Sequence, residues 1–422
     1  MLAAALGGVA IAMNVGKVPL ALALPLLRAE LGLSLLQAGW MSSVLSTLAV
    51  VAALGFGLLA GRIGALTMVL GGLGLSAAAS LLALAVHGAD AGGLLASTDA
   101  PGGGFGLLIA TRFFEGAGFL AVAVSGPSLI SAATAAGDRR FALGVWSSYM
   151  PTGAGLAMTL APLLLPAAGW RGLWVAAAAV LLLAAVAAWS QRLHYRPAGG
   201  SSHAAATGPT LSVLRQPLPW LLALAFGVWA LQHFALIVWL PTFLNEQRGY
   251  APGWVALLCC TMLLANVPGN LIGGALVQRG RSRGRLIATA HSLTGLCGLG
   301  LFSDALPDGL RYALCVALSS IGGVIPAAVM SNSTALARSP RQISALQGLF
   351  MQGSQLGQFI GTPLIAAVVA ASGAWGSARW VTAGAAALGV LLGFGAWRAE
   401  GVGRSDAGGG AGAGTGGSAN SN

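Results

Sequence analysis

The sequence Gly-Leu-Leu-Ala-Gly-Arg at Gly57–Arg62 ends one long apolar run, and Gly-Ala-Leu-Val-Gln-Arg at Gly274–Arg279 ends another. The first motif ends the second apolar segment of the chain, and the other ends the eighth. Each places a glycine and an arginine at the end of its segment. A weaker echo of this repeat is Trp-Val, at position 174 and again at position 380. We therefore expect a chain made of two related halves.

The composition places both halves in a membrane. Of the 422 residues, 56% are hydrophobic and 7% are charged, whereas soluble domains carry roughly 25% charged residues. A membrane-spanning helix needs about 20 apolar residues, so the length accommodates about a dozen spans. We bracket twelve, at residues 3–27, 37–60, 66–87, 104–134, 141–166, 170–190, 217–244, 253–277, 286–303, 309–336, 343–371 and 378–397.

The predicted fold is therefore an all-α membrane protein with twelve transmembrane helices in two pseudo-symmetric six-helix bundles. The first bundle is expected over residues 1–190 and the second over 217–398. Residues 191–216 are rich in Gly, Ser, Ala and Pro and predict a cytoplasmic linker. Residues 399–422 are dominated by Gly, Ala and Ser and predict a disordered tail, because they cannot bury enough apolar surface to fold.

The arginines predict the orientation. With the N-terminus in the cytoplasm, the inside segments hold fourteen arginines: Arg62, Arg139, Arg140, Arg192, Arg196, Arg215, Arg279, Arg281, Arg283, Arg285, Arg338, Arg341, Arg398 and Arg404. The outside segments hold five: Arg28, Arg171, Arg248, Arg311 and Arg379. Basic residues concentrate on the cytoplasmic side of membrane proteins, so both termini are expected inside, in a bacterial-style inner membrane.

Several classes of protein are excluded by the same patterns. The net charge of +11 is spread over short loops between apolar runs, which is a topology signal and not a nucleic-acid-binding patch. The four cysteines lie inside apolar runs without metal-ligand spacing. No zinc-protease, serine-hydrolase or ATP-binding motif is present, so we expect no enzyme, no cofactor and no metal.

Lys17 is a cation in the middle of the first span, within Asn14-Val-Gly-Lys-Val-Pro19. A charge at bilayer depth costs several kcal/mol unless it faces a protein interior or a watery cavity, so an intramembrane lysine predicts a functional site. The alternative is a lysine that extends to the headgroups. Lys17 lies about 25 Å along a helix from Met1, which is too deep for that on the near side. We therefore expect Asn14 and Lys17 to bind substrate.

Two sets of residues resemble a known family. The Gly57–Arg62 turn, its repeat and Arg112-Phe-Phe-Glu-Gly-Ala-Gly118 resemble the signature loops of the major facilitator superfamily. The resemblance implies gating roles for Arg62 and Arg279, although the acidic residue that relatives carry in the first loop is Gly61 here. Asn14-x-x-Lys17 and Trp239-Leu-Pro-Thr-Phe-Leu244 resemble the cyanate and nitroimidazole permease branch, with lysine in place of arginine.

Arg112 and Glu115 are three residues apart in the fourth span, so they share a helix face and can pair. Glu115 is the one acidic residue inside any bracketed span, which makes it the candidate for proton coupling. The alternative is a structural ion pair. Lys17 and Arg112 together outnumber this carboxylate, so the N-terminal half favours an anionic substrate.

Further candidates for substrate binding are neutral. We expect hydrogen bonds to substrate from Tyr149, Gln232, His233, Asn266, Asn270, Gln352 and Gln355. His233 is also a candidate for proton coupling, because histidine titrates near neutral pH. Each of these residues has an alternative role as an ordinary contact between helices.

The function expected from these patterns is secondary active uptake of a small anion by alternating access, coupled to protons. The anion would be cyanate-, nitrate- or nitrite-like, or a small carboxylate, and the partners would be this anion, protons and the lipid bilayer. One alternative is a drug or metabolite exporter of the same fold. Another is a membrane sensor that does not transport. We expect a monomer.

Overall fold

The computed structural model describes residues 1–17, 27, 30–33, 35–86, 104–195, 210–244, 248–303 and 305–409. The helices of the N-terminal half are α1 (Leu2–Gly16), α3 (Leu35–Ile63), α4 (Ala65–Ala83), α5 (Phe105–Ala132), α6 (Arg139–Trp146) and α7 (Tyr149–Ser190). Those of the C-terminal half are α8 (Pro217–Thr242), α9 (Pro252–Leu264), α10 (Asn266–Gln278), α11 (Arg283–Leu301), α12 (Asp308–Gly322), α13 (Val324–Leu336), α14 (Pro340–Ser372) and α15 (Ala378–Gly409). Short 3₁₀ turns are η1 (Arg192–Tyr195), η2 (Thr210–Arg215) and η4 (Trp375–Ser377).

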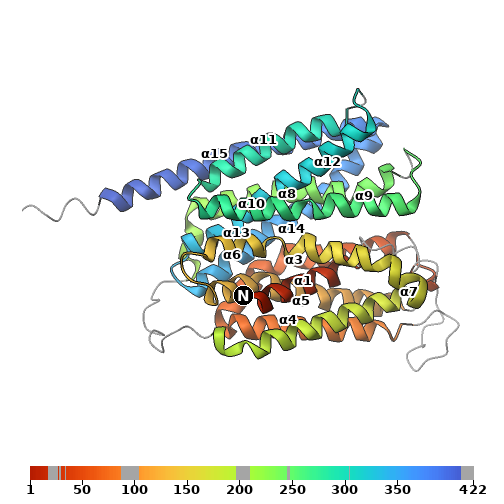
Figure 1. Ribbon diagram of the computed structural model, residues 1–422, viewed down its shortest axis with the longest axis horizontal. Coiled ribbons are helices and arrows are strands. Elements are labelled where there is room, and N and C mark those ends of the chain that lie inside the picture. The colour runs from red at the N-terminus through yellow and green to blue at the C-terminus, as the bar shows by residue number, and fades with distance from the viewer. Residues whose placement is uncertain are drawn as a thin grey trace, which may run out of the picture.

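The two halves form two layers of helices (Figure 1). α1 to α7 make up one layer and α8 to α15 the other, with the helices of both running along the same long direction. Eight helical segments are long and apolar enough to cross a membrane, and shorter apolar helices cover Leu2–Gly16 and Thr47–Ile63. The described residues contain no strand. The predicted all-α fold of twelve spans in two bundles is confirmed.

Some helices divide or combine to give these spans. α7 has 42 residues and breaks at Gly169, where φ is +59°. This backbone conformation suits glycine because other residues would place a Cβ too close to the carbonyl oxygen. The fifth span is therefore α6 with the first part of α7, and the sixth is the rest of α7. In the C-terminal half α9 continues into α10 through Ala265, and α12 into α13 through Gly323.

The chain beyond the last span differs from the prediction. α15 continues to Gly409, so residues 399–409 are helical and the helix does not stop at residue 398. The apolar span has already nucleated this helix, so the continuation needs no new nucleation, although its glycines have low helix propensity. Residues 410–422, the middle of the linker at 196–209, and Arg28 lie outside the described residues.

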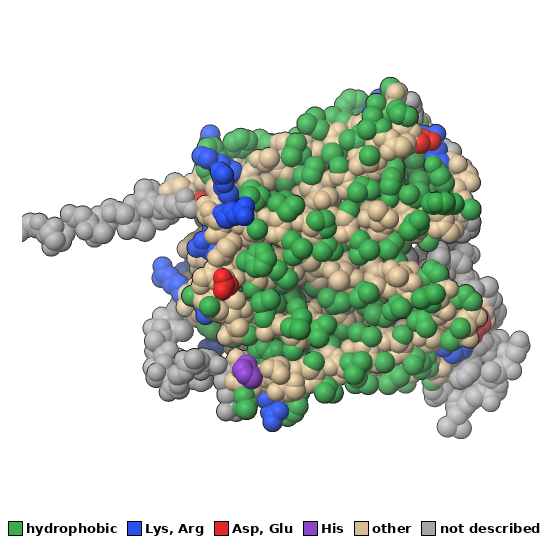
Figure 2. Space-filling model, viewed as in Figure 1, with side chains coloured by type: hydrophobic (Ala, Val, Ile, Leu, Met, Phe, Trp, Pro, Cys, Tyr) green, Lys and Arg blue, Asp and Glu red, His purple; other side chains and the backbone are tan. Residues whose placement is uncertain are grey.

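The two layers approach each other most closely at one end of the molecule. Arginine side chains gather there, on the left in Figure 2, and we call it the arginine-rich end. A Cβ built on Gly144 of α6 would collide with the Gly274 Cα of α10. A Cβ built on Gly57 of α3 would lie 2.5 Å from the Ser344 carbonyl oxygen of α14. Only glycine allows backbones this close, so the halves are closed against each other at the arginine-rich end.

Candidate functional site

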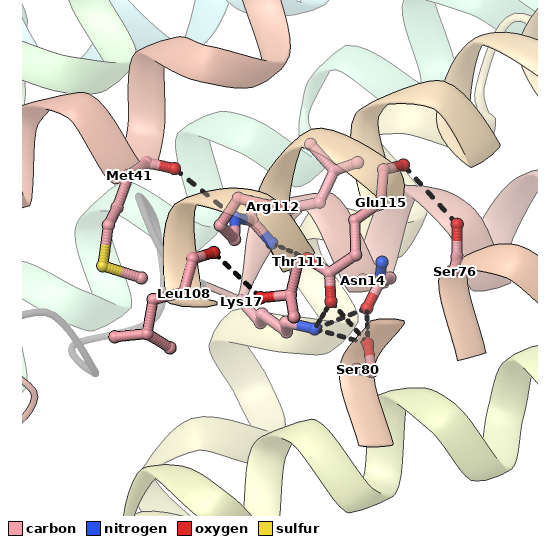
Figure 3. A network of polar contacts seen from close by, with 10 residues as sticks. Asn14, Lys17, Met41, Ser76, Ser80, Leu108, Thr111, Arg112 and Glu115 are labelled. Carbon is pink, nitrogen blue, oxygen red and sulfur yellow. Dashed lines mark hydrogen bonds and ion pairs between the residues drawn. The ribbon is translucent and has the colours of Figure 1, made fainter. Parts of the chain in front are cut away.

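Lys17 lies in the interior of the N-terminal half, directly after α1. Its Nζ donates to Asn14 Oδ1 at 2.6 Å, to Ser80 Oγ of α4 at 2.8 Å and to Glu115 Oε1 of α5 at 2.5 Å (Figure 3). The lysine is 1% exposed. All three ammonium hydrogens therefore have a partner, which is what a buried ammonium requires.

Arg112 binds the second oxygen of the same carboxylate. Its guanidinium donates to Glu115 Oε2, to the Val15 carbonyl at 3.2 Å and to the Met41 carbonyl at 3.4 Å. Both Arg112 and Glu115 are fully buried. The predicted contact between them is present, and Glu115 serves two cations instead of one. We call Asn14, Lys17, Ser80, Arg112 and Glu115 the charge cluster.

The charge cluster has more positive charge and more donors than its own acceptors satisfy. Two cations and one carboxylate leave one positive charge in excess when all three are ionised. The Trp174 ring lies against Lys17, with 4.5 Å from Nζ to the ring centroid. Asn14 Nδ2 and Trp174 Nε1 are buried without a hydrogen-bond partner among the described residues. Buried polar groups normally have partners, so these two donors are unusual among the described residues.

A second feature lies between the two halves, where a cavity of about 110 Å³ separates the helices of the N-terminal layer from α8, α9, α10, α13 and α14. We call it the central cavity. Its aromatic and methionine lining consists of Phe119, Tyr149, Met150, Phe226, Trp229, Phe234, Met330 and Met351. Its polar lining consists of Ser147, His233, Asn266, Ser354, Gln355 and Gln358. None of these lining residues is Lys, Arg, Asp or Glu, so the central cavity has a neutral lining.

His233 is held in place on two sides. Its Nε2 lies 2.9 Å from Ser319 Oγ, and its ring stacks on Trp229 with centroids 4.6 Å apart. The Asn266 amide donates to the Ser319 carbonyl at 2.7 Å, so α8, α10 and α12 meet at this serine. The network fixes the direction of the polar groups that face the central cavity.

The residues expected to bind substrate are divided between these places. The charge cluster contains Asn14, Lys17 and Arg112, and the central cavity is lined by Tyr149, His233, Asn266 and Gln355. Three more already have hydrogen-bond partners within the protein. Gln232 donates to the Thr382 carbonyl, Asn270 to both oxygens of Asn266, and Gln352 to the Val50 carbonyl of α3. The expected gating residues Arg62 and Arg279 are exposed at the arginine-rich end.

Several residues of these sites were not anticipated from the sequence, among them Ser80, Trp174 and Phe119. Ser80 bridges Lys17, Asn14 and Glu115; the spacing of Ser76 and Ser80, four residues apart in an apolar span, is the signal that points to it. Trp174 against Lys17 and Phe119 in the cavity lining have no such signal, because aromatic residues are common in the packing of membrane helices.

Comparison with known proteins identifies the family of this chain. The family described as Major Facilitator Superfamily matches residues 2–362. The chain belongs to the Major Facilitator Superfamily. The charge cluster and the central cavity both lie within this match, so they are features of a transporter fold.

Two solved structures share the superfamily fold over nearly the whole chain. A single-substitution variant of FucP, the fucose:proton symporter of E. coli, superposes with a TM-score of 0.71, covering 94% of this chain and 98% of that one at 15% identity. FucP in its outward conformation gives a TM-score of 0.69 with the same coverage at 16% identity. At such identities the likeness concerns the fold alone.

A sequence relative of this superfamily member is the probable sulfoacetate transporter SauU of Cupriavidus necator. It is 26% identical over 205 residues, which are 43% of this chain and 47% of that protein. The match thus spans about half the length of the relative.

Proposed function

We propose that the protein is a secondary transporter that takes up a small anion together with protons by alternating access. The observation that carries this proposal is the charge cluster, in which a single carboxylate faces two buried cations. An excess positive charge inside a membrane protein is costly, and a bound anion offsets that cost. Lys17 is the principal counter-charge for the anion, and Arg112 is the second.

Glu115 links the anion to the proton in this proposal. While ionised, Glu115 occupies both cations through its two oxygens. An incoming anion must compete with it for Lys17. A proton on Glu115 weakens both ion pairs, which leaves Lys17 and Arg112 available to the anion. Anion and proton then bind together more favourably than either alone, which is the requirement for symport.

The central cavity supplies neutral hydrogen bonds at the interface between the halves. Tyr149, His233, Asn266 and Gln355 are the lining residues assigned to substrate, and His233 is a second candidate for a proton step. We assign the same role to Gln232, Asn270 and Gln352. Each of them must first exchange its present hydrogen bond for one with substrate. Rocking of the two layers around this cavity would give access to each side in turn.

The arginine-rich end is the cytoplasmic face in this proposal, with both termini inside and with Arg62 and Arg279 as gate elements. The protein acts as a monomer in the inner membrane. The linker over 191–216 joins the bundles of residues 1–190 and 217–398. In this arrangement the cytoplasmic gate is shut by the glycine contacts between α6 and α10 and between α3 and α14.

The relatives support parts of this proposal. SauU is named as a probable sulfoacetate transporter, and sulfoacetate is a small organic anion. FucP is named as a proton symporter. Asn14-x-x-Lys17 and Trp239–Leu244 resemble the cyanate and nitroimidazole permeases. We propose on this basis that the protein belongs to that branch of the superfamily.

One observation favours a second candidate, the drug or metabolite exporter. The central cavity has a largely apolar lining with no charged residue, which suits an uncharged apolar cargo. Such an exporter does not depend on Lys17. The two candidates therefore differ in what removal of this lysine does.

The test is uptake into proteoliposomes with a panel of nitrate, cyanate, acetate and sulfoacetate, with and without an inward proton gradient. The variant Lys17→Ala is compared with wild type and with Arg171→Ala, which removes an arginine from a partly exposed ion pair with Glu30. Saturable, gradient-driven uptake that Lys17→Ala abolishes and Arg171→Ala retains supports the proposal. Uptake that survives Lys17→Ala, or stabilisation by apolar drugs alone, refutes it in favour of the exporter.

A further inference from the structure

The charge cluster and the central cavity meet on α5. Phe119 follows Glu115 by four residues, so the two side chains lie on one face of the helix, about 6 Å apart along its axis. Glu115 belongs to the charge cluster, and Phe119 lines the central cavity. Phe119 is 3% exposed, so its ring is packed inside the protein, one helical turn from the carboxylate.

The region beyond Phe119 has a lining that an inorganic anion does not need. Nitrate or cyanate requires positive charge or several converging donors, because a dissolved anion gives up strong hydration when it binds. The lining residues of the central cavity carry no formal charge, and most of them are apolar, with aromatic rings and methionines prominent among them. The stacked Trp229 and His233 rings offer a flat surface on which a planar group can lie.

We infer that the substrate is an organic anion with an apolar body, whose anionic group is bound by Lys17 and whose body occupies the central cavity beside Phe119. This inference rests on the proposed function and adds the chemical class of the substrate. It makes Phe119 a specificity-determining residue, because its ring contacts the body at the point where the anionic group enters the charge cluster. An aromatic or alkyl carboxylate has both an anionic group for the charge cluster and an apolar body for the central cavity. Nitrate and cyanate have no such body.

The dimensions of the site suit an organic anion that has both an anionic group and an apolar body. One helical turn separates Glu115 from Phe119, about 6 Å, which is the scale of a carboxylate joined to a ring through one or two carbon atoms. The central cavity of about 110 Å³ has room for a body of that size. Burial of such a body in an aromatic and methionine lining contributes affinity that an inorganic anion cannot obtain.

The test is competition against radiolabelled phenylacetate in proteoliposomes that hold the full chain, with phenylacetate, acetate, nitrate and cyanate as unlabelled competitors. We expect phenylacetate to compete at a concentration about tenfold lower than acetate, since one well-packed ring contributes roughly that factor. In Phe119→Leu the difference should shrink to about twofold. Phe114→Leu is the matched control on the same helix, because Phe114 is 45% exposed and should leave the difference unchanged.

The outcomes separate this inference from the proposed function. If nitrate or cyanate competes as well as phenylacetate, and its uptake requires Lys17, the proposed function stands and the inference is overturned. If Lys17→Ala leaves phenylacetate uptake intact, both are overturned. An unchanged preference in a folded Phe119→Leu protein, judged by its size-exclusion profile, overturns the role of Phe119.

Discussion

Lys17 and Glu115 are 98 residues apart in the chain, yet the Lys17 ammonium lies 2.5 Å from the Glu115 carboxylate inside the N-terminal half. The same carboxylate binds the guanidinium of Arg112 through its other oxygen. This shared carboxylate is the basis of the proposed coupling. Each cation retains its charge partner only as long as Glu115 stays ionised.

Glu115→Gln is expected to destabilise the protein and to make its stability depend on anions. The glutamine leaves Lys17 and Arg112 buried without a counter-charge, and removal of one partner from a buried ion pair costs about 3–5 kcal/mol. A bound anion replaces the missing charge. A transported anion should therefore raise the midpoint of thermal unfolding more in Glu115→Gln than in wild type.

Ser76→Ala is the control for that measurement, because Ser76 Oγ donates to the backbone carbonyl of Glu115, at 3.5 Å, and among the described residues it makes no bond to the carboxylate. Its response to anions should equal that of wild type. An equal response in wild type and in Glu115→Gln would show that the anion does not enter the charge cluster.

Lys17→Met is expected to abolish anion uptake with a smaller loss of stability than Glu115→Gln. Glu115 keeps Arg112 as its partner in this variant, so no buried charge is left alone. Lys17→Arg preserves the charge and should restore part of the uptake. Initial uptake rates and thermal unfolding of the three proteins check this order. A larger stability loss in Lys17→Met than in Glu115→Gln would contradict the assignment of charges.

Ser80→Ala is expected to lower stability by about 1–2 kcal/mol and to weaken anion binding. The Ser80 hydroxyl accepts from Lys17 at 2.8 Å and lies 2.6 Å from Glu115 Oε1. Its removal leaves buried polar groups short of a partner, which costs about 1–3 kcal/mol. Urea or thermal unfolding and anion titration measure the two effects. Ser80→Thr keeps the hydroxyl and should fall between wild type and Ser80→Ala.

Gly144→Leu is expected to open the arginine-rich end. Any side chain at position 144 meets the backbone of Gly274, since a Cβ built there would collide with the Gly274 Cα. The closed state should lose population, and amide hydrogen exchange in α6 and α10 should become faster. Gly71→Leu is the control, because no atom lies within 4 Å of a Cβ built there. Unchanged exchange in Gly144→Leu would show that this contact does not hold the gate.

The sequence contains enough to predict the fold and only part of the site. The apolar runs and the repeat at Gly57–Arg62 determine the two bundles, because membrane-spanning segments must satisfy their backbone groups as helices. The pairing of Arg112 and Glu115 follows from a spacing of three residues on one helix. Such local relationships are visible in a single chain.

The remaining features depend on how distant helices rotate against each other. Nothing in the sequence shows that Lys17 faces Glu115, or that Ser80 lies between them. The glutamines of α14 illustrate the same limit: Gln355 lines the central cavity, whereas Gln352, one turn earlier, donates to Val50 of α3. Both residues are glutamines on nearly the same face of α14. They differ only in what each side chain meets in the folded protein.

The most direct test of the account is proton uptake when an anion binds. The purified protein in detergent and weak buffer, with a pH indicator, is titrated with the anion that wild type transports best. We predict uptake of up to about one proton per bound anion in wild type, because Glu115 must bind a proton when it gives up Lys17. We predict no proton uptake in Glu115→Gln. Anion binding without proton uptake in wild type, or equal proton uptake in Glu115→Gln, would contradict it.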